Sequence, residues 1–273
     1  MSAIVLSAGV RSNLLQLQQT SDLITSTQTK LATGKRVNSA LDNPNNYFTA
    51  QALDNRAGDL NNLLDSMSTA INTIGAANNG ISAITKLVQS AQSLTSQAKQ
   101  TSDTTTKASL STQFDEILAQ IGKLATDSGF NGINLLGGDT LTVTLNEDAT
   151  STATITGVDY TDANATPLSI DNAANNWASD SDIDAAATDL TTALTTLRSE
   201  SQTLGSSLST VQIRQDFTKA TINTLQSGSD ALTLADSNQE GANLLALQTR
   251  QQLSTTALSL ASQADQNVLR LFQ

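Results

Sequence analysis

The sequence predicts a mainly α-helical fold: a long, antiparallel, coiled-coil-like helical rod that folds back on itself and carries a small β-hairpin insert. Apolar residues repeat every seven positions along much of the chain of 273 residues, and only Pro44 and Pro167 are prolines. Such a repeat is typical of helices that pair along a narrow seam, and prolines interrupt helices. Aromatic residues make up 3% of the chain, which indicates a narrow aliphatic core rather than the core of a globular enzyme.

The first two helices are predicted from their apolar seams. The first ends near Gly34, and its seam is Val10, Leu14, Leu17, Ile24 and Leu31. Asn43 and Pro44 suit the cap and the first turn of a second helix, which begins near residue 44. The second seam repeats strictly every seven residues, at Leu53, Leu60, Met67, Ile74, Ile81 and Val88. Six such repeats predict a long helix with a partner along one side.

A third helix and a hairpin follow. Asp103 is placed to cap a helix whose apolar positions are Leu110, Phe114, Ile117, Ile121 and Leu124. Glycines between 129 and 138 end it. Residues 141–145 and 153–155 alternate apolar residues with threonine, which predicts a β-hairpin. A loop around Pro167 then leads to Trp177.

A fourth helix, capped by Asp180 or Ser181, carries one heptad line from Ile183 to Leu232 with Thr218 as its single polar member. A break at 236–241 precedes a last helix with Leu253, Ala257, Leu260, Ala264, Val268 and Leu271. Because each seam needs a partner of similar length, both termini are expected at one tip of the rod. The terminal seams are narrow, so these arms are expected to order fully only among several copies.

Charge and composition exclude several classes of function. The chain has no His, no Cys and a net charge of −11. Without His or Cys there is no common nucleophile pair and no usual zinc site, so we expect no enzyme, cofactor or metal. Asp180, Asp182 and Asp184 resemble the start of a calcium loop, but Ala185 and Thr191 replace its glycine and glutamate.

The negative charge is concentrated in one segment. Between Leu124 and Leu197 there are 11 acidic residues and no Lys or Arg, while the rest of the chain has 14 acids and 14 bases. Binding to nucleic acid or anionic membranes depends on clustered Lys and Arg. We therefore expect neither as a partner, and another protein is the expected one. The start of the chain also lacks the basic region and apolar core of a signal peptide.

Three separated segments resemble the bacterial flagellins. Residues 31–42 are similar to the N-terminal signature of that family, residues 130–136 to its Phe-Asn-Gly turn, and residues 263–271 to its C-terminal ending. They occur in the family's order, and the resemblance covers roughly residues 1–137 and 181–273. The run from Asp42 to Phe48 departs from the family's usual Asp-Asp-Ala-Ala-Gly and is similar to alphaproteobacterial flagellins with a short variable region.

The resemblance implies a structural subunit that polymerises into the flagellar filament used for swimming. It implies secretion by flagellar type III export to the cell exterior. Residues 1–35 and 237–273 would then be terminal arms in an inner tube, 36–137 and 181–236 a rod domain in an outer tube, and 138–180 a solvent-facing acidic insert. The implied partners are copies of the chain, related flagellins, the export apparatus, an export chaperone, and hook-associated and cap proteins.

Candidate assembly residues, which we expect at a subunit interface or in the core seam, lie in the terminal seams, in the signature and, for Arg56, in the second helix. They are Val10, Leu14, Leu17, Ile24, Leu31, Arg36, Asn38, Asp42, Arg56, Leu253, Leu260, Val268 and Leu271. A bidentate guanidinium at Arg36 could hold a neighbouring subunit, although Arg36 and Arg56 could instead be solvated surface charges.

Two further expectations come from the family. Thr142, Thr144, Thr154 and Thr156 are candidate O-glycosylation sites, with ordinary solvent-facing strand threonines as the alternative. The segment that the innate immune receptor for flagellin grips aligns with residues 82–86, which lack its arginines. Weak or no activation of that receptor is therefore expected.

Two other functions stay open at this point. A hook-filament junction protein has similar terminal arms but forms a short layer, so growth of purified protein into long filaments would separate it from a filament subunit. From a different class, a secreted helical adhesin would keep its adhesive middle region when the C-terminus is removed.

Overall fold

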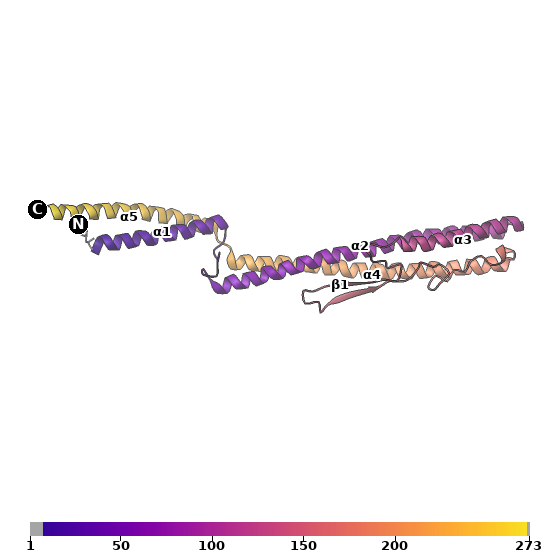
Figure 1. The fold of residues 1–273 in the computed structure, drawn as a ribbon. Helices are drawn as coiled ribbons and strands as arrows, with labels where there is room; N and C mark the ends of the chain where they lie inside the picture. The colour runs from indigo at the N-terminus through magenta and orange to yellow at the C-terminus, as the bar shows by residue number, and fades with distance from the viewer. Residues whose placement is uncertain (1–7, 272–273) are drawn as a thin grey trace. The chain divides into compact units, whose positions relative to one another are not determined.

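The computed structural model describes the backbone of residues 8–271, and the side chains in that range except those of residues 265 and 268–271. Its helices and strands are α1 (Ala8–Thr33), α2 (Pro44–Gln100), α3 (Thr104–Thr126), β1 (Thr140–Thr144), β2 (Thr152–Thr156), the short 3₁₀ turn η1 (Ala174–Trp177), α4 (Asp180–Thr233) and α5 (Ser237–Leu271) (Figure 1). The predicted helices and hairpin are thus present. The side chains of the candidate assembly residues Val268 and Leu271 lie outside the described residues.

The chain forms two compact units. Unit 1 combines Met1–Asn55 with Thr224–Gln273, and unit 2 is Arg56–Asn223. The division between them therefore falls within α2 and within α4, some way from the ends of the predicted terminal arms. The assignment of arms, rod and insert to tubes of a filament concerns the assembled polymer and stays a prediction.

The core of unit 2 confirms the two long heptad seams. In α2 the buried members are Leu60, Met67, Ile74, Ile81 and Val88, and in α4 they are Ile183, Leu190, Leu197, Leu204, Val211 and Thr218. Asn78 accepts a hydrogen bond from the Ser201 hydroxyl at 2.9 Å, and Gln215 donates one to the Ser68 hydroxyl at 2.9 Å. These two pairs show that the helices run antiparallel. A polar pair within an apolar seam also opposes sliding of one helix along the other.

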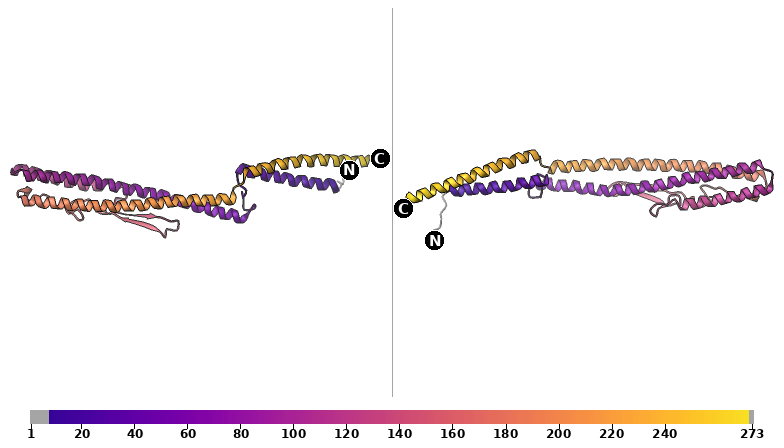
Figure 2. Two further views of the ribbon diagram at one scale, coloured as in Figure 1. Left: turned by 180° about the vertical axis from the view of Figure 1, so that it is seen from behind. Right: turned by 90° about the horizontal axis from the view of Figure 1, so that it is seen from above.

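The insert packs against the helices of unit 2 as a further layer (Figure 2). The Trp177 ring lies 5.0 Å from the Phe114 ring of α3, and Trp177 is 0% exposed. The side chains of Tyr160, Leu168 and Ile170 are also buried. Trp177 is the single tryptophan of the chain, so its fluorescence reports on the packing of unit 2.

Close backbone contacts hold the insert to α3. A Cβ atom at Gly122, inside α3, would lie 2.2 Å from the carbonyl oxygen of Thr161. No side chain can be accommodated at that distance, so the glycine allows the loop to lie directly on the helix. By contrast, a Cβ at Gly75 in α2 would meet nothing within 4 Å.

The helix starts are partly as predicted. Asp103 caps α3 and accepts hydrogen bonds from the backbone N–H groups of Thr105 and Thr106, as expected. The predicted cap of α4 is wrong, because α4 begins at Asp180 and the hydroxyl of Ser179 accepts the N–H of Asp182 at 3.3 Å. The Asp180 carboxylate instead bonds a lysine of α3, which leaves the capping role to the preceding serine.

In unit 1, α1 and α5 lie side by side and antiparallel (Figure 1), and Lys30 is 3.7 Å from Glu240 near one end of the pair. The partly buried positions of α5 are Glu240, Gly241, Leu244, Leu247, Gln251, Ser254, Leu258 and Ala261. Leu253 and Leu260 are 67% and 62% exposed, so they do not form a core seam within the chain, and their role at a subunit interface stays a prediction. Both faces of α5 carry leucines at helical spacing, and the sequence pattern does not distinguish them.

The core of unit 1 is small. Its buried apolar side chains among the described residues are Val10, Val37 and Ala50, and the other buried positions of α1 are Thr20 and Thr27. Burial of apolar area is the main favourable contribution to folding. Unit 1 therefore draws much less stabilisation from its own core than unit 2 does.

Candidate assembly surfaces

The signature segment between α1 and α2 closes onto the end of α4. The backbone N–H groups of Arg36 and Val37 donate to the carbonyl oxygen of Thr233 at 2.6 and 3.3 Å, and the Arg36 guanidinium donates to the carbonyl oxygen of Leu232 at 3.1 Å. The last carbonyls of a helix have no partner inside the helix, and a cation there is favoured by the helix dipole. Arg36 thus joins two segments of its own chain, and it remains exposed to solvent.

Asn38 and Asp42 shape this segment. One Asp42 carboxylate oxygen accepts the N–H groups of Asn38 and Ser39, each at 2.9 Å, and the Asn38 amide donates to the carbonyl oxygen of Lys35 at 2.9 Å. The hydrogen bonds from Asn38 and Ser39 lower the pKa of the Asp42 carboxyl, because they favour its ionised form. The side chains of Asn38 and Asp42 therefore position the loop. The side chain of Leu41, next to Asp42, is 95% exposed.

The predicted assembly residues of α1 divide between two environments. Val10 is buried, and Leu17, Ile24 and Leu31 are half-buried on the side toward α5. Leu14 is 38% exposed and faces solvent with other leucines of the terminal helices, namely Leu15, Leu23, Leu245, Leu253 and Leu260. The terminal pair thus presents leucines that its own fold does not cover.

Arg56 holds the insert. Its Nε atom donates to the Glu147 carboxylate at 2.5 Å, which ties the turn of the hairpin to α2. The contact lies within unit 2 and was not apparent from the sequence, because 91 residues separate the two partners. A role of Arg56 between subunits stays a prediction.

The hairpin places its threonines on one face. Thr140 pairs with Thr156, Thr142 with Thr154 and Thr144 with Thr152, while Leu141, Val143 and Ile155 alternate with them and are buried. Thr144 is half-buried and the other five threonines are exposed. All four candidate glycosylation sites therefore share one row of hydroxyl groups on the side away from the core.

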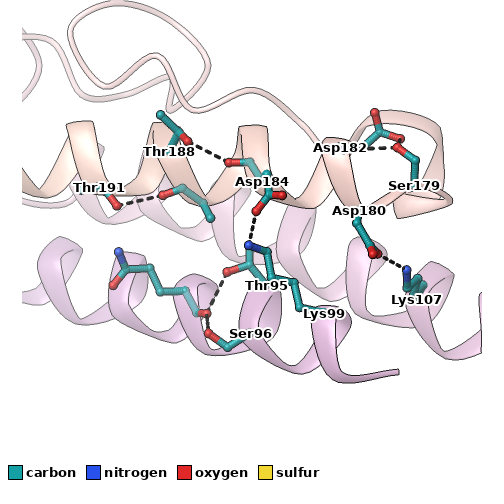
Figure 3. A network of polar contacts seen from close by, with 12 residues as sticks. Thr95, Ser96, Lys99, Lys107, Ser179, Asp180, Asp182, Asp184, Thr188 and Thr191 are labelled. Atoms are coloured by element: carbon teal, nitrogen blue, oxygen red, sulfur yellow. Dashed lines mark hydrogen bonds and ion pairs between the residues drawn. The ribbon is translucent and has the colours of Figure 1, made fainter. Parts of the chain in front are cut away.

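Two lysines bind the acidic start of α4 (Figure 3). Lys107 of α3 donates to the Asp180 carboxylate at 2.7 Å, and Lys99 of α2 pairs with Asp184. The Lys107 side chain is only 8% exposed, so its charge needs this partner. The hydrogen bond and charge of Lys107, with a contribution from Lys99, lower the pKa of the Asp180 carboxyl. These contacts join all three long helices of unit 2 at one end.

The Lys107–Asp180 ion pair predicts a loss of stability in acid. Because folding lowers the Asp180 pKa, the pair stabilises the folded state above the unfolded-state pKa of about 3.9. This stabilisation is lost as the pH falls through the folded-state pKa. The urea midpoint followed by Trp177 fluorescence should fall less in Asp180→Asn than in the parent chain between about pH 6 and about pH 2.5. An equal fall of the urea midpoint in both proteins would show that the Lys107–Asp180 pair does not contribute to stability.

No described residues form a group of three or more His, Cys, Asp or Glu that could hold a metal ion. Across the part of the chain that the structure describes, no helix has both the length and the apolar character to cross a bilayer.

Comparisons with known proteins show which family the chain resembles. Two family models match the chain, the bacterial flagellin N-terminal helical region over residues 8–140 and the bacterial flagellin C-terminal helical region over residues 185–272. Flagellin FljK of Caulobacter vibrioides is 31% identical over 282 residues, covering 100% of this chain and 99% of that protein. A Brucella melitensis flagellin is 28% identical over 285 residues, covering 100% of both chains. The crystal structure of Bacillus cereus flagellin has a TM-score of 0.47 and 21% identity, covering 57% of this chain and 88% of that one.

Proposed function

The chain belongs to the bacterial flagellin family and is a structural subunit of the extracellular flagellar filament used for swimming, and we propose that its copies join through the outward faces of α1 and α5. The family is one of structural proteins, so the chain is not an enzyme. No finding favours a hook-filament junction protein or an adhesin instead.

The exposed leucines of the terminal helices are the observation that carries this proposal. Leu15 and Leu23 of α1 are 57% and 51% exposed, and Leu245, Leu253 and Leu260 of α5 are 62–67% exposed. Burying a leucine side chain stabilises by roughly 1.5–3 kcal/mol. Five such residues on a unit with a small core give a strong drive toward association with further copies. In this proposal the leucines of one copy pack against those of its neighbours.

The rest of the chain is assigned to the filament wall and its exterior. We place residues 1–35 and 237–273 in an inner tube, residues 36–137 and 181–236 in an outer tube, and residues 138–180 toward solvent. The threonine face of the hairpin and the excess of acids between Leu124 and Leu197 support an exterior position for the insert. Thr142, Thr144, Thr154 and Thr156 are our candidates for O-glycosylation on that exterior.

Several partners are proposed on the strength of the family alone. They are the flagellar export apparatus, an export chaperone, and hook-associated and cap proteins. Related flagellins are proposed as partners in the same filament, because FljK and FljM of one organism, Caulobacter vibrioides, both match the whole chain.

We also propose weak or no activation of the innate immune receptor for flagellin. Within residues 82–86 of α2, Ile84 is buried, Ser82 and Lys86 are exposed, and none of the five residues is an arginine. Purified monomer should therefore leave receptor-reporter cells near their background signal. Strong activation by purified monomer would contradict this assignment.

Arg36 tests whether the signature segment takes part in assembly. Its guanidinium is exposed beside the end of α4, so Arg36→Glu places an anion next to carbonyl oxygens and any acidic neighbour. We expect Arg36→Glu to raise the critical concentration for seeded polymerisation at least about tenfold, with normal expression of the monomer and unchanged helix content by circular dichroism, which includes the helices of unit 1.

Lys35→Glu is the matched control, because it makes the same change of charge one residue away at another exposed side chain. Filaments should form from Lys35→Glu near the parent concentration. Normal filaments from Arg36→Glu would contradict a role for Arg36 in assembly.

A further inference from the structure

An apolar patch on α4 is not covered within unit 2. Ile213 and Phe217 are 65% and 62% exposed and lie one turn apart on the same side of the helix. Val211, Thr218 and Ile222 of the same helix are buried, so the patch lies on the side away from the core. Large apolar side chains at this exposure favour contact with another surface.

The patch carries a positive charge. Arg214 lies between its two members and has no ion-pair partner among the described residues. Asp216, on the other side of the patch, lies 3.8 Å from Lys219 and is thereby partly neutralised. A surface that combines Ile213, Phe217 and Arg214 fits a partner with an exposed apolar side chain beside an acid.

Unit 2 has one such surface elsewhere. Among its described residues, Phe130 is the other large apolar side chain that is exposed, at 39%. It begins a tight turn in which Phe130 and Ile133 exchange backbone hydrogen bonds of 2.9 and 3.0 Å. Asp127 lies exposed three residues before it, in the segment without Lys or Arg. The Phe130 turn and the Ile213–Phe217 patch therefore both expose apolar side chains, and the charges beside them, Asp127 and Arg214, are opposite.

The two surfaces lie apart within one molecule. The Phe130 turn follows Ser128, which contacts α2 at Gly80, and neighbouring Asn78 bonds Ser201 of α4. From Ser201 to Phe217 the distance along α4 is about 24 Å at 1.5 Å per residue. Two complementary surfaces at different places on one subunit make a head-to-tail contact that does not close on itself, which is the geometry of an open helical polymer.

We propose that the Ile213–Phe217 patch binds the Phe130 turn of a second copy of this chain, with Arg214 facing Asp127 of that copy. The proposal rests on the function as a filament subunit and adds a contact between unit 2 surfaces to the one made by the terminal helices. It assigns a role in assembly to residues that lie outside the heptad seams.

Charge exchange tests the contact. Phe217→Ser should raise the critical concentration for seeded polymerisation about tenfold, and Arg214→Asp about fivefold, with the urea midpoint of the monomer unchanged. The double variant Arg214→Asp/Asp127→Arg restores opposite charges and should return to within about twofold of the parent. Arg198→Asp, the same change on an exposed residue of α4 outside the patch, is the control.

Disulfide cross-linking tests the same contact in the filament, since the parent chain has no cysteine. Oxidised filaments of Phe130→Cys/Phe217→Cys should give a ladder of covalent multimers, and the same protein as monomer should not. The control pair Phe130→Cys/Lys219→Cys, with its second cysteine on the opposite side of α4, should give none. If the double variant fails to fold by Trp177 fluorescence, the two single variants mixed in one filament should give covalent dimers.

The outcomes separate this inference from the proposed function. The contact would be overturned if parent filaments grow normally and Phe217→Ser assembles like the parent. It would also be overturned if the cysteine pair gives no cross-link in such filaments. Either result would leave the filament function intact. Failure of the parent chain itself to form filaments would overturn the proposed function.

Discussion

Removing residues 254–273 should abolish polymerisation while leaving unit 2 folded. The deletion takes away Leu258 and Ala261, which face α1, and Leu260, which is 62% exposed. Both the terminal helix pair and its outward leucines are then incomplete, whereas no part of unit 2 is removed. We expect no seeded filaments at concentrations at least about a hundredfold above the parent critical concentration, with unchanged Trp177 fluorescence.

A smaller change separates the two roles of α5. Leu253→Ser with Leu260→Ser alters only the outward face and should raise the critical concentration by about tenfold or more for each residue. The control, Gln252→Ser with Thr256→Ser, changes exposed polar side chains of the same helix and should have little effect. Normal assembly of the truncated chain, or equal effects of the two double variants, would contradict the interface.

Gly122→Ala should destabilise unit 2 strongly. A Cβ at this position would lie 2.2 Å from the carbonyl oxygen of Thr161, and a backbone atom cannot turn away as the end of a side chain can. The loop must move off α3, which also disturbs the packing of Trp177 on Phe114. We expect a loss of about 2–4 kcal/mol in the free energy of unfolding, measured by urea titration of Trp177 fluorescence.

Gly75→Ala is the matched control within α2. Its Cβ would meet nothing within 4 Å, and alanine is the better helix former. This variant should be more stable than the parent by about 0.5–1 kcal/mol. A Gly122→Ala protein as stable as Gly75→Ala would show that the loop does not lie on α3 as described.

Much of the fold could be predicted because the long helices follow a simple rule. A strict heptad line in α2 and another in α4 each determine which side is buried, and Met67, Ile74 and Leu197 lie where the pattern requires. The hairpin could be predicted equally well, since its threonines alternate with apolar residues at a period of two. In these elements local pattern and tertiary packing agree.

The remaining features depend on contacts between distant residues. The choice between two leucine faces on α5 depends on how α1 approaches, and no local pattern records it. Asp180 pairs with Lys107, which lies 73 residues away in the sequence, and Ser179 caps α4 instead. Trp177 was predicted only as the end of a loop, although it is buried against Phe114.

The candidate assembly surfaces were predicted only in part, because they too depend on contacts between distant residues. The sequence identified Arg36, Asn38 and Asp42 from a motif, and the structure shows how they fold the signature segment onto the end of α4. It did not identify Ile213 and Phe217, although both are large apolar residues outside the heptad line of α4. Apolar residues that fall outside a strict seam are the signal that could have revealed this patch.

Surfaces that are exposed on one chain are expected to be buried by its copies in the filament. A cryo-microscopy reconstruction of the assembled filament resolves which side chains lie between subunits. In it we expect Leu245, Leu253 and Leu260 to be buried between copies near the axis, and the threonine face of the hairpin to be turned to the exterior. Terminal leucines that face solvent, or a hairpin buried within the wall, would contradict this expectation.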